Sequence, residues 1–414
     1  MELLRFFTAG NVDDGKSTLI GRLLYDSDSI STDIIETLTR QSKTTGANSQ
    51  IDLALLTDGL RAEREQGITI DVAYKYFTTD KRKFIIADTP GHIQYTRNMF
   101  TGASNANLAI ILIDARNGIT DQTKRHSVLC AILGIPHVLI CINKMDLVNY
   151  SETKYKEIET NYLIFAKQLG LKNISFIPAS ALAGDNVVKK SENMNWYKGP
   201  ALLEFLETVN IAKEKESDAP RFQVQFVIRP QTLDLPDYRG VAGRVISGFY
   251  KKGQRVIILP SKIESVISRI EVNQKEVNIA ERNQPVVLHL KDNIDVSRGD
   301  TIVPIESLPK TEKEITATIC WMDNSSFIPG QKIVLQQNSF RTKAIVKEVI
   351  SKVDIHSFLE IKSDGSMKLN DICKVLIKTA EAISFDSYSE NRGSGAFILL
   401  NENTNNTIAA GTIN

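Results

Sequence analysis

The apolar residues in the first half of the chain follow two alternating patterns. Short, almost continuous apolar runs are typical of buried strands, and the segments between them carry apolar residues at helical spacing. We expect strands at residues 3–9, 72–77, 84–88, 108–114, 138–143 and 174–178. We expect helices at residues 18–24, 122–133 and 152–169. Because buried strands that alternate with helices form parallel sheets covered on both faces, the pattern predicts an α/β domain with a mostly parallel, doubly wound sheet.

After a charged segment at residues 213–218 and Pro220, the pattern changes to short strands without helices between them. Glycines such as Gly240 and Gly253 separate the strands, and a second break at Pro309 divides them into two groups. Short strands joined by glycine-containing turns are typical of small closed barrels. The sequence therefore predicts three domains: the α/β domain at residues 1–215, one β-barrel at 220–306 and a second β-barrel at 311–414.

The composition suits folded domains and disfavours two kinds of partner. With 414 residues, 42% of them hydrophobic and 24% charged, the chain can bury several cores. Its 50 basic residues are balanced by 49 acidic ones, whereas a protein that wraps a nucleic acid usually has a basic excess. The four cysteines lack metal or disulfide spacing, and no apolar run approaches the roughly 18 residues of a membrane span. Because the first strand begins close to Met1, we expect no signal peptide and a cytoplasmic protein without a nucleic-acid or membrane partner.

A glycine-rich loop follows the first expected strand and precedes the first expected helix. It fits the pattern G-x-x-x-x-G-K-[ST], whose backbone N–H groups wrap a polyphosphate. The positive end of the helix dipole adds to this anion site. Lys16 is expected to reach the β- and γ-phosphates, and the Ser17 hydroxyl is expected to hold Mg²⁺. The expected phosphate-binding residues are Gly10, Asn11, Val12, Asp13, Asp14, Gly15, Lys16, Ser17 and Thr18.

A second motif, Asp88-Thr89-Pro90-Gly91-His92, lies at the end of another expected strand. A carboxylate at this place meets the Mg²⁺ shell, usually through water, and a glycine beside the γ-phosphate lets the backbone sense that phosphate. By itself the motif is more typical of an ordinary turn. Its position roughly seventy residues after the glycine-rich loop favours the functional interpretation.

A third motif, Asn143-Lys144-Met145-Asp146, follows the strand at residues 138–142. An aspartate here can accept hydrogen bonds from the N1–H and 2-amino groups of guanine, which adenine does not offer in that geometry. As an isolated tetrapeptide the motif is more typical of a simple helix start, capped by Asn143 or Asp146. The place at the carboxyl end of a parallel strand favours guanine recognition. Ser180, Ala181 and Leu182, after the next strand, are expected to complete the base pocket through backbone contacts.

A long polar stretch between the first helix and the second strand ends at residues 62–70. A threonine in such a loop can complete Mg²⁺ coordination only while the γ-phosphate is present, which makes the loop a switch. The charged residues Glu63, Arg64 and Glu65 are also typical of a solvated helix. The remaining histidines, including His126, have no neighbours at metal-ligand or triad spacing, and we expect them to be structural.

Together these motifs resemble those of the translational class of GTPases, to which elongation factor Tu belongs. The expected order of one nucleotide-binding domain and two barrels agrees with that class. Longer strings are more similar to the GTPase subunits (large subunit, subunit 1) of bacterial sulfate adenylyltransferase. These strings are residues 12–18, 62–74, 84–99, 193–200 and 295–300.

This resemblance implies roles for individual residues. Ser17 and Thr69 would ligate Mg²⁺, with Asp88 acting through water, and Asn143, Lys144 and Asp146 would select guanine. His92 would orient the water that attacks GTP, with Val12 and Ile68 as an apolar gate beside it. The catalytic set implied is therefore His92, Lys16, Thr69 and Asp88, and the cofactors are GTP and Mg²⁺.

The resemblance also implies a partner. In this family a separate, smaller catalytic subunit transfers the adenylyl group of ATP to sulfate, giving adenosine 5′-phosphosulfate and pyrophosphate, and GTP hydrolysis drives that unfavourable step. Asp14 stands where elongation factors have histidine, which favours this branch over a carrier of aminoacyl-tRNA, the alternative function. Ile93 stands where the family has an acidic residue, which leaves the support of His92 open. A second loop with Gly-Lys-Ser/Thr is absent, so a fused adenylylsulfate kinase is not expected.

Overall fold

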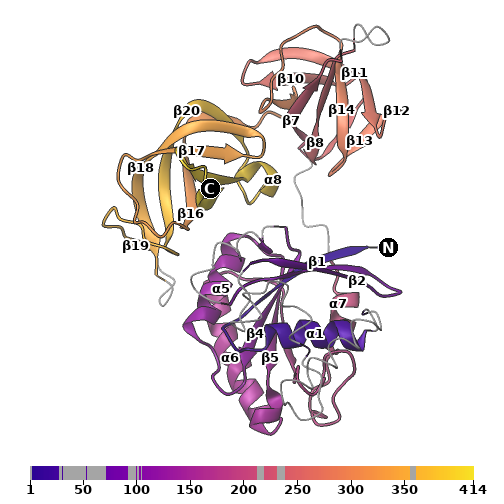
Figure 1. Ribbon diagram of the computed structural model, residues 1–414, viewed down its shortest axis with the longest axis vertical. Coiled ribbons are helices and arrows are strands. Elements are labelled where there is room, and N and C mark those ends of the chain that lie inside the picture. The colour runs from indigo at the N-terminus through magenta and orange to yellow at the C-terminus, as the bar shows by residue number, and fades with distance from the viewer. Residues whose placement is uncertain are drawn as a thin grey trace. The chain divides into compact units, whose positions relative to one another are not determined.

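The computed structural model describes residues 2–27, 30, 53, 71–91, 99, 102–103, 105–211, 219–230, 238–354 and 360–414, and every structural statement below concerns these residues. They fall mainly into two compact units, one within residues 1–212 and the other within residues 213–414 (Figure 1). We describe each unit by itself.

The first unit is built on a six-stranded sheet with the order β2-β3-β1-β4-β5-β6. All neighbouring pairs are parallel except β2 and β3, which are antiparallel. The strands are β1 (Leu3–Ala9), β2 (Ala73–Thr78), β3 (Lys83–Asp88), β4 (Leu108–Asp114), β5 (His137–Asn143) and β6 (Ile174–Pro178). The helices are α1 (Lys16–Asp26), α5 (Asp121–Ile132), the 3₁₀-helix η3 (Met145–Val148), α6 (Glu152–Gln168) and α7 (Leu202–Thr208).

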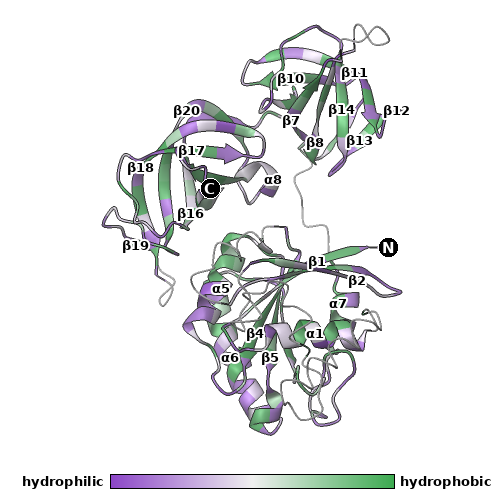
Figure 2. Ribbon diagram, viewed as in Figure 1, coloured by the Kyte–Doolittle hydropathy of each residue, from purple (hydrophilic) through white to green (hydrophobic). Residues whose placement is uncertain are grey.

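Both faces of this sheet are apolar, which is why β4 is buried along its whole length. Alternate residues of β1 and β4 belong to one core cluster together with apolar residues of α1 and α7. Helices α5 and α6 lie on the other side, where the Ser127 and Tyr162 hydroxyls are 2.7 Å apart (Figure 1). In Figure 2 the central strands of this unit are mostly hydrophobic, whereas its helices carry both hydrophobic and hydrophilic residues.

The register of the sheet brings the candidate motifs to one edge. Thr8 of β1 is level with Asp88 of β3. Asp114 of β4 is level with Asn143 of β5. Because parallel strands end at the same edge, the loops after β1, β3, β4, β5 and β6 converge there.

The second unit contains two barrels, each closed by six strands. In the first, the ring runs β10-β15-β7-β8-β14-β11 and closes through the β10–β11 pair. Its strands are β7 (Arg221–Ile228), β8 (Gly240–Ser247), β9 (Phe249–Lys251), β10 (Arg255–Leu259), β11 (Ile263–Val272), β12 (Lys275–Val277), β13 (Ile279–Glu281), β14 (Pro285–Leu290) and β15 (Thr301–Pro304). The short strand β12 extends this sheet, and β9 pairs with β13 beside it.

In the second barrel the ring runs β17-β21-β22-β16-β20-β18 and closes through the β17–β18 pair. Its elements are β16 (Lys310–Trp321), β17 (Lys332–Gln337), β18 (Phe340–Val353), β19 (Glu360–Lys362), β20 (Ile372–Phe385), α8 (Arg392–Gly395), β21 (Ala396–Asn401) and β22 (Thr407–Ile413). Trp321 and Phe327 pack edge to face in its core, with ring centroids 5.6 Å apart.

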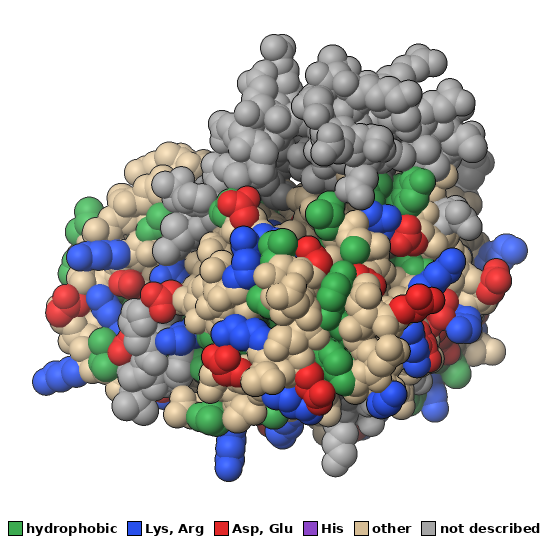
Figure 3. Space-filling view, turned by 90° about the horizontal axis from the view of Figure 1, so that it is seen from below, with side chains coloured by type: hydrophobic (Ala, Val, Ile, Leu, Met, Phe, Trp, Pro, Cys, Tyr) green, Lys and Arg blue, Asp and Glu red, His purple; other side chains and the backbone are tan. Residues whose placement is uncertain are grey.

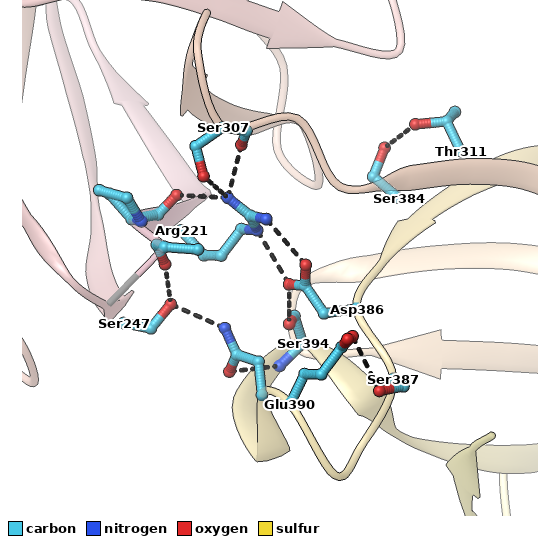
Figure 4. A network of polar contacts seen from close by, with 12 residues as sticks. Arg221, Ser247, Ser307, Thr311, Ser384, Asp386, Ser387, Glu390 and Ser394 are labelled. Carbon is cyan, nitrogen blue, oxygen red and sulfur yellow. Dashed lines mark hydrogen bonds and ion pairs between the residues drawn. The ribbon is translucent and has the colours of Figure 1, made fainter. Parts of the chain in front are cut away.

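A buried polar network joins the two barrels (Figure 4). Arg221 at the start of β7 donates from Nε and Nη2 to the two carboxylate oxygens of Asp386, at 2.9 and 2.7 Å. Asp386 also accepts from the Ser394 hydroxyl at 2.5 Å. The Asn391 amide donates to the Ser247 hydroxyl at 2.8 Å. Since these groups are nearly enclosed, the network links the barrels by directional contacts rather than by apolar packing alone.

The fold class expected from the sequence, an α/β nucleotide-binding domain followed by two barrels, is confirmed. A polar turn after residue 400 connects β21 to the final strand β22. The burial of that final strand is nearly complete. Strand β16 begins at Lys310, directly after the break expected at Pro309, because residues 310–312 pair with the end of β20.

Candidate functional site

The glycine-rich loop at residues 10–17, named the phosphate loop for its expected role, has a backbone that requires glycine at its end. Gly15 has φ 92° and directly precedes α1. A Cβ atom added to Gly15 would lie 2.5 Å from the amide nitrogen of Asn143. Side chains other than hydrogen are therefore excluded both by the left-handed backbone and by the close approach of β5.

Lys16 is enclosed by the loop that precedes it. Its side chain is buried, and Nζ donates to the carbonyl oxygens of Gly10 at 3.1 Å and Asn11 at 2.8 Å. Burial lowers the pKa of Lys16, and the negative charges of Asp88 and Asp14 oppose that shift. A lysine held by the loop that precedes a helix is suited to neutralising phosphate oxygens.

Asp14, where elongation factors have histidine, is a structural residue of the loop. It is buried, and its carboxylate accepts the Asn11 N–H at 2.6 Å. Burial raises the pKa of Asp14, while the Asn11 hydrogen bond and the charge of Lys16 lower it. The side-chain oxygen of Asn11 accepts the Val12 N–H at 2.9 Å, so the loop is closed from within. Asp13 is exposed with φ 69°, and Ser17 and Thr18 are half-buried in the first turn of α1.

Asp88 and Gly91 lie beside this loop. Asp88 at the end of β3 is fully buried and accepts from the Thr8 hydroxyl at 3.1 Å. The Thr89 hydroxyl donates to the carbonyl oxygen of Thr8 at 2.5 Å, which fixes the second motif to β1. A Cβ atom on Gly91 would lie 2.3 Å from Nζ of Lys16 and 2.7 Å from the carbonyl oxygen of Gly10. The two motifs are therefore in direct contact, although more than seventy residues separate them in sequence.

Asn143 joins three segments of the site. Its buried amide donates to the carbonyl oxygen of Asp14 at 2.7 Å, and its side-chain oxygen accepts the Ala181 N–H at 2.9 Å. One side chain thus fixes the phosphate loop, the end of β5 and the loop after β6 relative to one another. This arrangement explains why an amide is needed here, since the residue must donate and accept at once.

Lys144 and Asp146 flank the start of η3. Lys144 has φ 61°, and its Nζ lies 3.0 Å from a carboxylate oxygen of Asp114. Burial alone would raise the pKa of Asp114, but hydrogen bonds from Arg116 and Lys144 outweigh it and lower the pKa to about 2. Asp146 is half-buried in the first turn of η3, on the same edge of the sheet.

The loop after β6 is held from behind by α1. Arg22 donates from Nε to the carbonyl oxygen of Ala181 at 3.3 Å and from Nη2 to that of Leu182 at 2.7 Å. Ser180 is fully buried, and its hydroxyl accepts the Ala183 N–H at 3.2 Å. Leu182 is exposed beyond these contacts, so its side chain is free to lie against a planar ligand.

The structure brings most of the expected site residues to one edge of the sheet. Thr69, His92 and the gate residue Ile68 lie outside the described residues, as does Ile93. Gln122 was not among the expected site residues, yet its amide donates to the carbonyl oxygen of Gly91 at 3.2 Å.

Several other contributors were also missed, namely Thr8, Arg22 and Asp114. Each acts by bracing a loop that is distant in sequence, so no local pattern marks it. Only the places of Thr8 and Asp114 near the ends of their strands offered a signal, because strand ends in such sheets face the ligand.

The donor set suits a hard cation only in part. Within the described segments, no group of three or more His, Cys, Asp or Glu side chains could hold a metal ion. Mg²⁺ is usually held by one or two protein oxygens together with phosphate oxygens, which matches the Ser17 hydroxyl and the Asp88 carboxylate. Among the helices of the described residues, none is long and apolar enough to cross a membrane.

Comparison with protein families agrees with this geometry. Residues 1–213 match the family described as the elongation factor Tu GTP binding domain. Residues 314–414 match the family described as GTP-eEF1A C-terminal domain-like. Similarity among solved structures includes the Ski7 GTPase-like domain of S. cerevisiae bound to GTP, with a TM-score of 0.55, 19% identity, and coverage of 100% of this chain and 97% of that one. At this identity the likeness concerns the fold alone.

Full-length relatives are more similar. Sulfate adenylyltransferase subunit 1 of Colwellia psychrerythraea is 48% identical over 414 residues, covering 100% of this chain and 88% of that protein. The protein of the same name from Bacteroides thetaiotaomicron is 48% identical, with 100% and 86% covered. The bifunctional enzyme CysN/CysC of Mycobacterium tuberculosis is 46% identical, covering 99% of this chain and 67% of that protein.

Proposed function

The chain belongs to the family of sulfate adenylyltransferase subunit 1, within the translational-type GTPases, and on that premise we propose that it hydrolyses GTP to drive sulfate activation on a partner subunit. The partner would transfer the adenylyl group of ATP to sulfate, releasing pyrophosphate. The observation that carries the proposal is the identity to proteins named subunit 1 over the whole chain, both barrels included. A name that specifies one subunit implies a second one.

The geometry supports guanine nucleotide binding at the edge of the first unit. Gly10 to Thr18 would hold the phosphates, with Lys16 between the β- and γ-phosphates. Asp146 would accept hydrogen bonds from the base, and the backbone at Ser180, Ala181 and Leu182 would close the pocket. We call residues 180–182 the base loop. Asn143 supports this assignment because its side chain bonds both the phosphate loop and the base loop and so sets the distance between them.

Mg²⁺ would be held by the hydroxyls of Ser17 and Thr69, with Asp88 in contact through water. When bound, the ion neutralises the charge that develops on the phosphate oxygens. Asp88 suits this role because it is fully buried beside the phosphate loop and its carboxylate accepts a hydrogen bond from the Thr8 hydroxyl. We propose that His92 orients the attacking water, and that Val12 and Ile68 restrict access to it.

Gly91 supports a link between nucleotide state and the rest of the chain. Its backbone lies against Lys16 and the phosphate loop, so it can report the presence of a γ-phosphate to the segment that follows. Such a link is reciprocal: if GTP changes the affinity for the partner, the partner changes the affinity for GTP. We propose a heterodimer on this basis, acting early in the assimilation of sulfate toward cysteine.

A cytoplasmic location is part of the proposal. All four cysteines are buried thiols rather than members of disulfides, as is usual where thiols are kept reduced. The proposed substrates, GTP and ATP, are also supplied there.

A carrier of aminoacyl-tRNA is the alternative function. The balanced charge of the chain disfavours it, and so does the mixture of Lys, Arg, Asp and Glu over the face shown in Figure 3. Asp14 disfavours it as well, because it stands where elongation factors have histidine. A salt-sensitive, GTP-dependent complex with aminoacyl-tRNA would reverse this choice.

The test of the proposal measures coupled turnover. The chain is co-purified with candidate partners, and GTP hydrolysis is measured with ATP and sulfate present and absent. We expect hydrolysis to rise when both are present and adenosine 5′-phosphosulfate to accumulate only while GTP is cleaved. Formation of adenosine 5′-phosphosulfate that is indifferent to GTP would refute the coupling. His92→Ala is expected to slow hydrolysis while GTP affinity is largely kept.

The base assignment has its own test. Asp146→Asn replaces an acceptor by a group that donates, which suits the 2-oxo group of xanthine better than the 2-amino group of guanine. We expect the preference to shift from GTP to XTP by about 100-fold or more, since a mismatched buried hydrogen bond is strongly rejected. Competition binding with the two nucleotides measures it, and an unchanged preference for GTP would remove Asp146 from the base pocket.

A further inference from the structure

The base pocket is made of two segments that are joined at both ends. Asp146 belongs to the segment after β5, and residues 180–182 belong to the segment after β6. At the sheet, Asn143 joins them by accepting the Ala181 N–H. Beyond the sheet, a second connection runs from the end of η3 to the far end of the loop after β6. That second connection has no counterpart among the motifs described so far.

Tyr150 is the first part of this connection. It has φ 55°, an uncommon conformation for a bulky residue, and it follows Asn149 with φ 54°. Three hydrogen bonds hold it there. Its N–H donates to the carbonyl oxygen of Met145 at 2.8 Å, its own carbonyl oxygen accepts from Trp196 Nε1 at 3.0 Å, and its hydroxyl donates to Asp185 Oδ2 at 2.9 Å. The first of these bonds closes the turn that carries Asp146.

Asp185 is the second part, and it contacts both segments. Its carboxylate accepts from the hydroxyls of Tyr150 and Ser191, the latter at 2.6 Å. Its backbone carbonyl oxygen accepts the Ser180 N–H at 3.1 Å. One residue therefore ties the end of η3 to the beginning of the base loop. A carboxylate with two hydroxyl donors is a strong and directional anchor.

Trp196 completes the connection from the opposite side of Tyr150. Its indole ring packs on Tyr155 of α6, with ring centroids 5.1 Å apart. It lies in the string of residues 193–200, which the sequence analysis noted without a role. Packing on a helix fixes the indole, so its N–H is a stationary donor to the Tyr150 carbonyl.

We propose that Tyr150, Asp185 and Trp196 form a brace of positioning residues that sets the distance between Asp146 and residues 180–182 for guanine recognition. The inference deepens the proposed function and rests on its assignment of the base pocket. The brace residues do not touch the nucleotide; they act through the backbone of η3 and of the base loop. Loss of the brace lets the two segments separate, so discrimination of the base weakens before the phosphate contacts do.

The test compares GDP with IDP on the full chain. Inosine keeps the N1–H of guanine but lacks its 2-amino group, so the GDP-to-IDP affinity ratio reports the alignment of Asp146. Tyr150→Phe removes a single hydroxyl. We expect this ratio to fall about 3- to 10-fold, the usual worth of one hydrogen bond, with faster GDP release.

Two further variants separate positioning from general damage. Asp185→Asn keeps groups that can bond both hydroxyls and should retain the ratio, whereas Asp185→Ala should lower it. Tyr76→Phe makes the same chemical change at an exposed tyrosine of β2 and should alter neither the ratio nor the melting temperature.

The outcomes distinguish the brace from the function on which it rests. A wild-type chain that binds no GDP refutes the proposed function. A wild-type chain that prefers GDP to IDP, with the same preference in Tyr150→Phe and Asp185→Ala, refutes the brace alone. The brace is supported if the GDP-to-IDP affinity ratio falls in Tyr150→Phe and Asp185→Ala at unchanged melting temperature and is retained in Asp185→Asn.

Discussion

At the scale of single residues, close approach between distant segments determines which side chains the site tolerates. Gly91 lies against backbone atoms of Gly10 and Asn11 as well as the end of Lys16. A lysine side chain can move, but the backbone of the phosphate loop cannot move without losing its shape. The site therefore depends on the absence of a side chain at Gly91 as much as on the charge of Lys16.

Gly91→Ala should thus weaken nucleotide binding. The added Cβ would lie 2.7 Å from the Gly10 carbonyl oxygen, and relief of such overpacking costs about 1–3 kcal/mol, or roughly 5- to 150-fold in affinity. Isothermal calorimetry with GTP measures the loss. Gly170→Ala is the control, because Gly170 has φ 67° with nothing within 4 Å of its Cβ position, so the change strains the backbone without touching the site.

His126 on α5 was expected to be structural, and the structure places it close to the site. It is fully buried, and its Nε2 lies 3.0 Å from the amide of Gln122, which in turn contacts Gly91. Burial, together with the positive charges of Lys16 and Arg125, lowers the pKa of His126 to about 3. The residue therefore stays neutral in the folded chain at pH values where the unfolded chain is protonated.

This shift predicts a pH dependence with a definite sign. Below the unfolded pKa of about 6.5 the unfolded state binds the proton and the folded state does not, so stability falls as the pH falls. Between about pH 7.5 and pH 5, His126 should cost the first unit roughly 2 kcal/mol, and His126→Gln should remove that part of the loss. Hydrogen exchange of the α5 amides at the two pH values measures it. Equal losses in the wild-type and variant chains would contradict the shift.

At the scale of elements, the site lies at one edge of the sheet, where hydrogen bonds connect the loops that follow different strands. Strands β1, β3 and β5 deliver their loops to the same place, and polar side chains then fix the spacing. Asn143 makes the central connection, because its two hydrogen bonds reach the loops after β1 and β6. Helix α1 adds Arg22, which donates to two carbonyl oxygens of the base loop.

Asn143→Ala should therefore lower stability and nucleotide affinity together. The change leaves the Asp14 carbonyl oxygen and the Ala181 N–H buried without this partner, at about 1–3 kcal/mol each. We expect a loss of roughly 2–6 kcal/mol in the unfolding free energy of the first unit, measured by urea denaturation. Gln168→Ala, an exposed amide at the end of α6, should change it by less than about 0.5 kcal/mol.

At the scale of the whole molecule, the two barrels form one unit joined by the network around Arg221. The guanidinium also donates to the carbonyl oxygens of Pro220 and Ser307, at 2.9 and 2.8 Å, so all its nitrogens have partners. The barrel cores differ in kind, since only the second contains a tryptophan. We call the network around Arg221 the joint; it connects two separate barrel cores by polar contacts.

Arg221→Met tests that joint. Removing one partner of a buried ion pair leaves the Asp386 carboxylate uncompensated, which typically costs about 3–5 kcal/mol. We expect a lower melting temperature of the second unit and unchanged GTP affinity of the first. Arg255→Met breaks an exposed pair with Glu264 and should cost less than about 1 kcal/mol. If Arg221→Met lowered stability no more than Arg255→Met, the two barrels would be held together by apolar packing instead.

The sequence by itself determined the class of fold and the kind of ligand site. Apolar periodicity gave the strands of the first unit, because burial on both faces demands continuous apolar runs. The glycine-rich loop, the Asp88 motif and the Asn143 motif were recognisable because each is local, and each stands after a strand. The domain boundaries and the roles of Thr69 and His92 stay predictions.

Only the tertiary structure decided how these local pieces meet. The antiparallel placement of β2 and the closing pairs β10–β11 and β17–β18 depend on partners far along the chain. So do the contacts of Arg22, Asn143 and Asp185, which connect loops from different strands. A hydrogen bond between such loops depends on strand order and register, and these follow from the packing of all the strands at once rather than from any single segment.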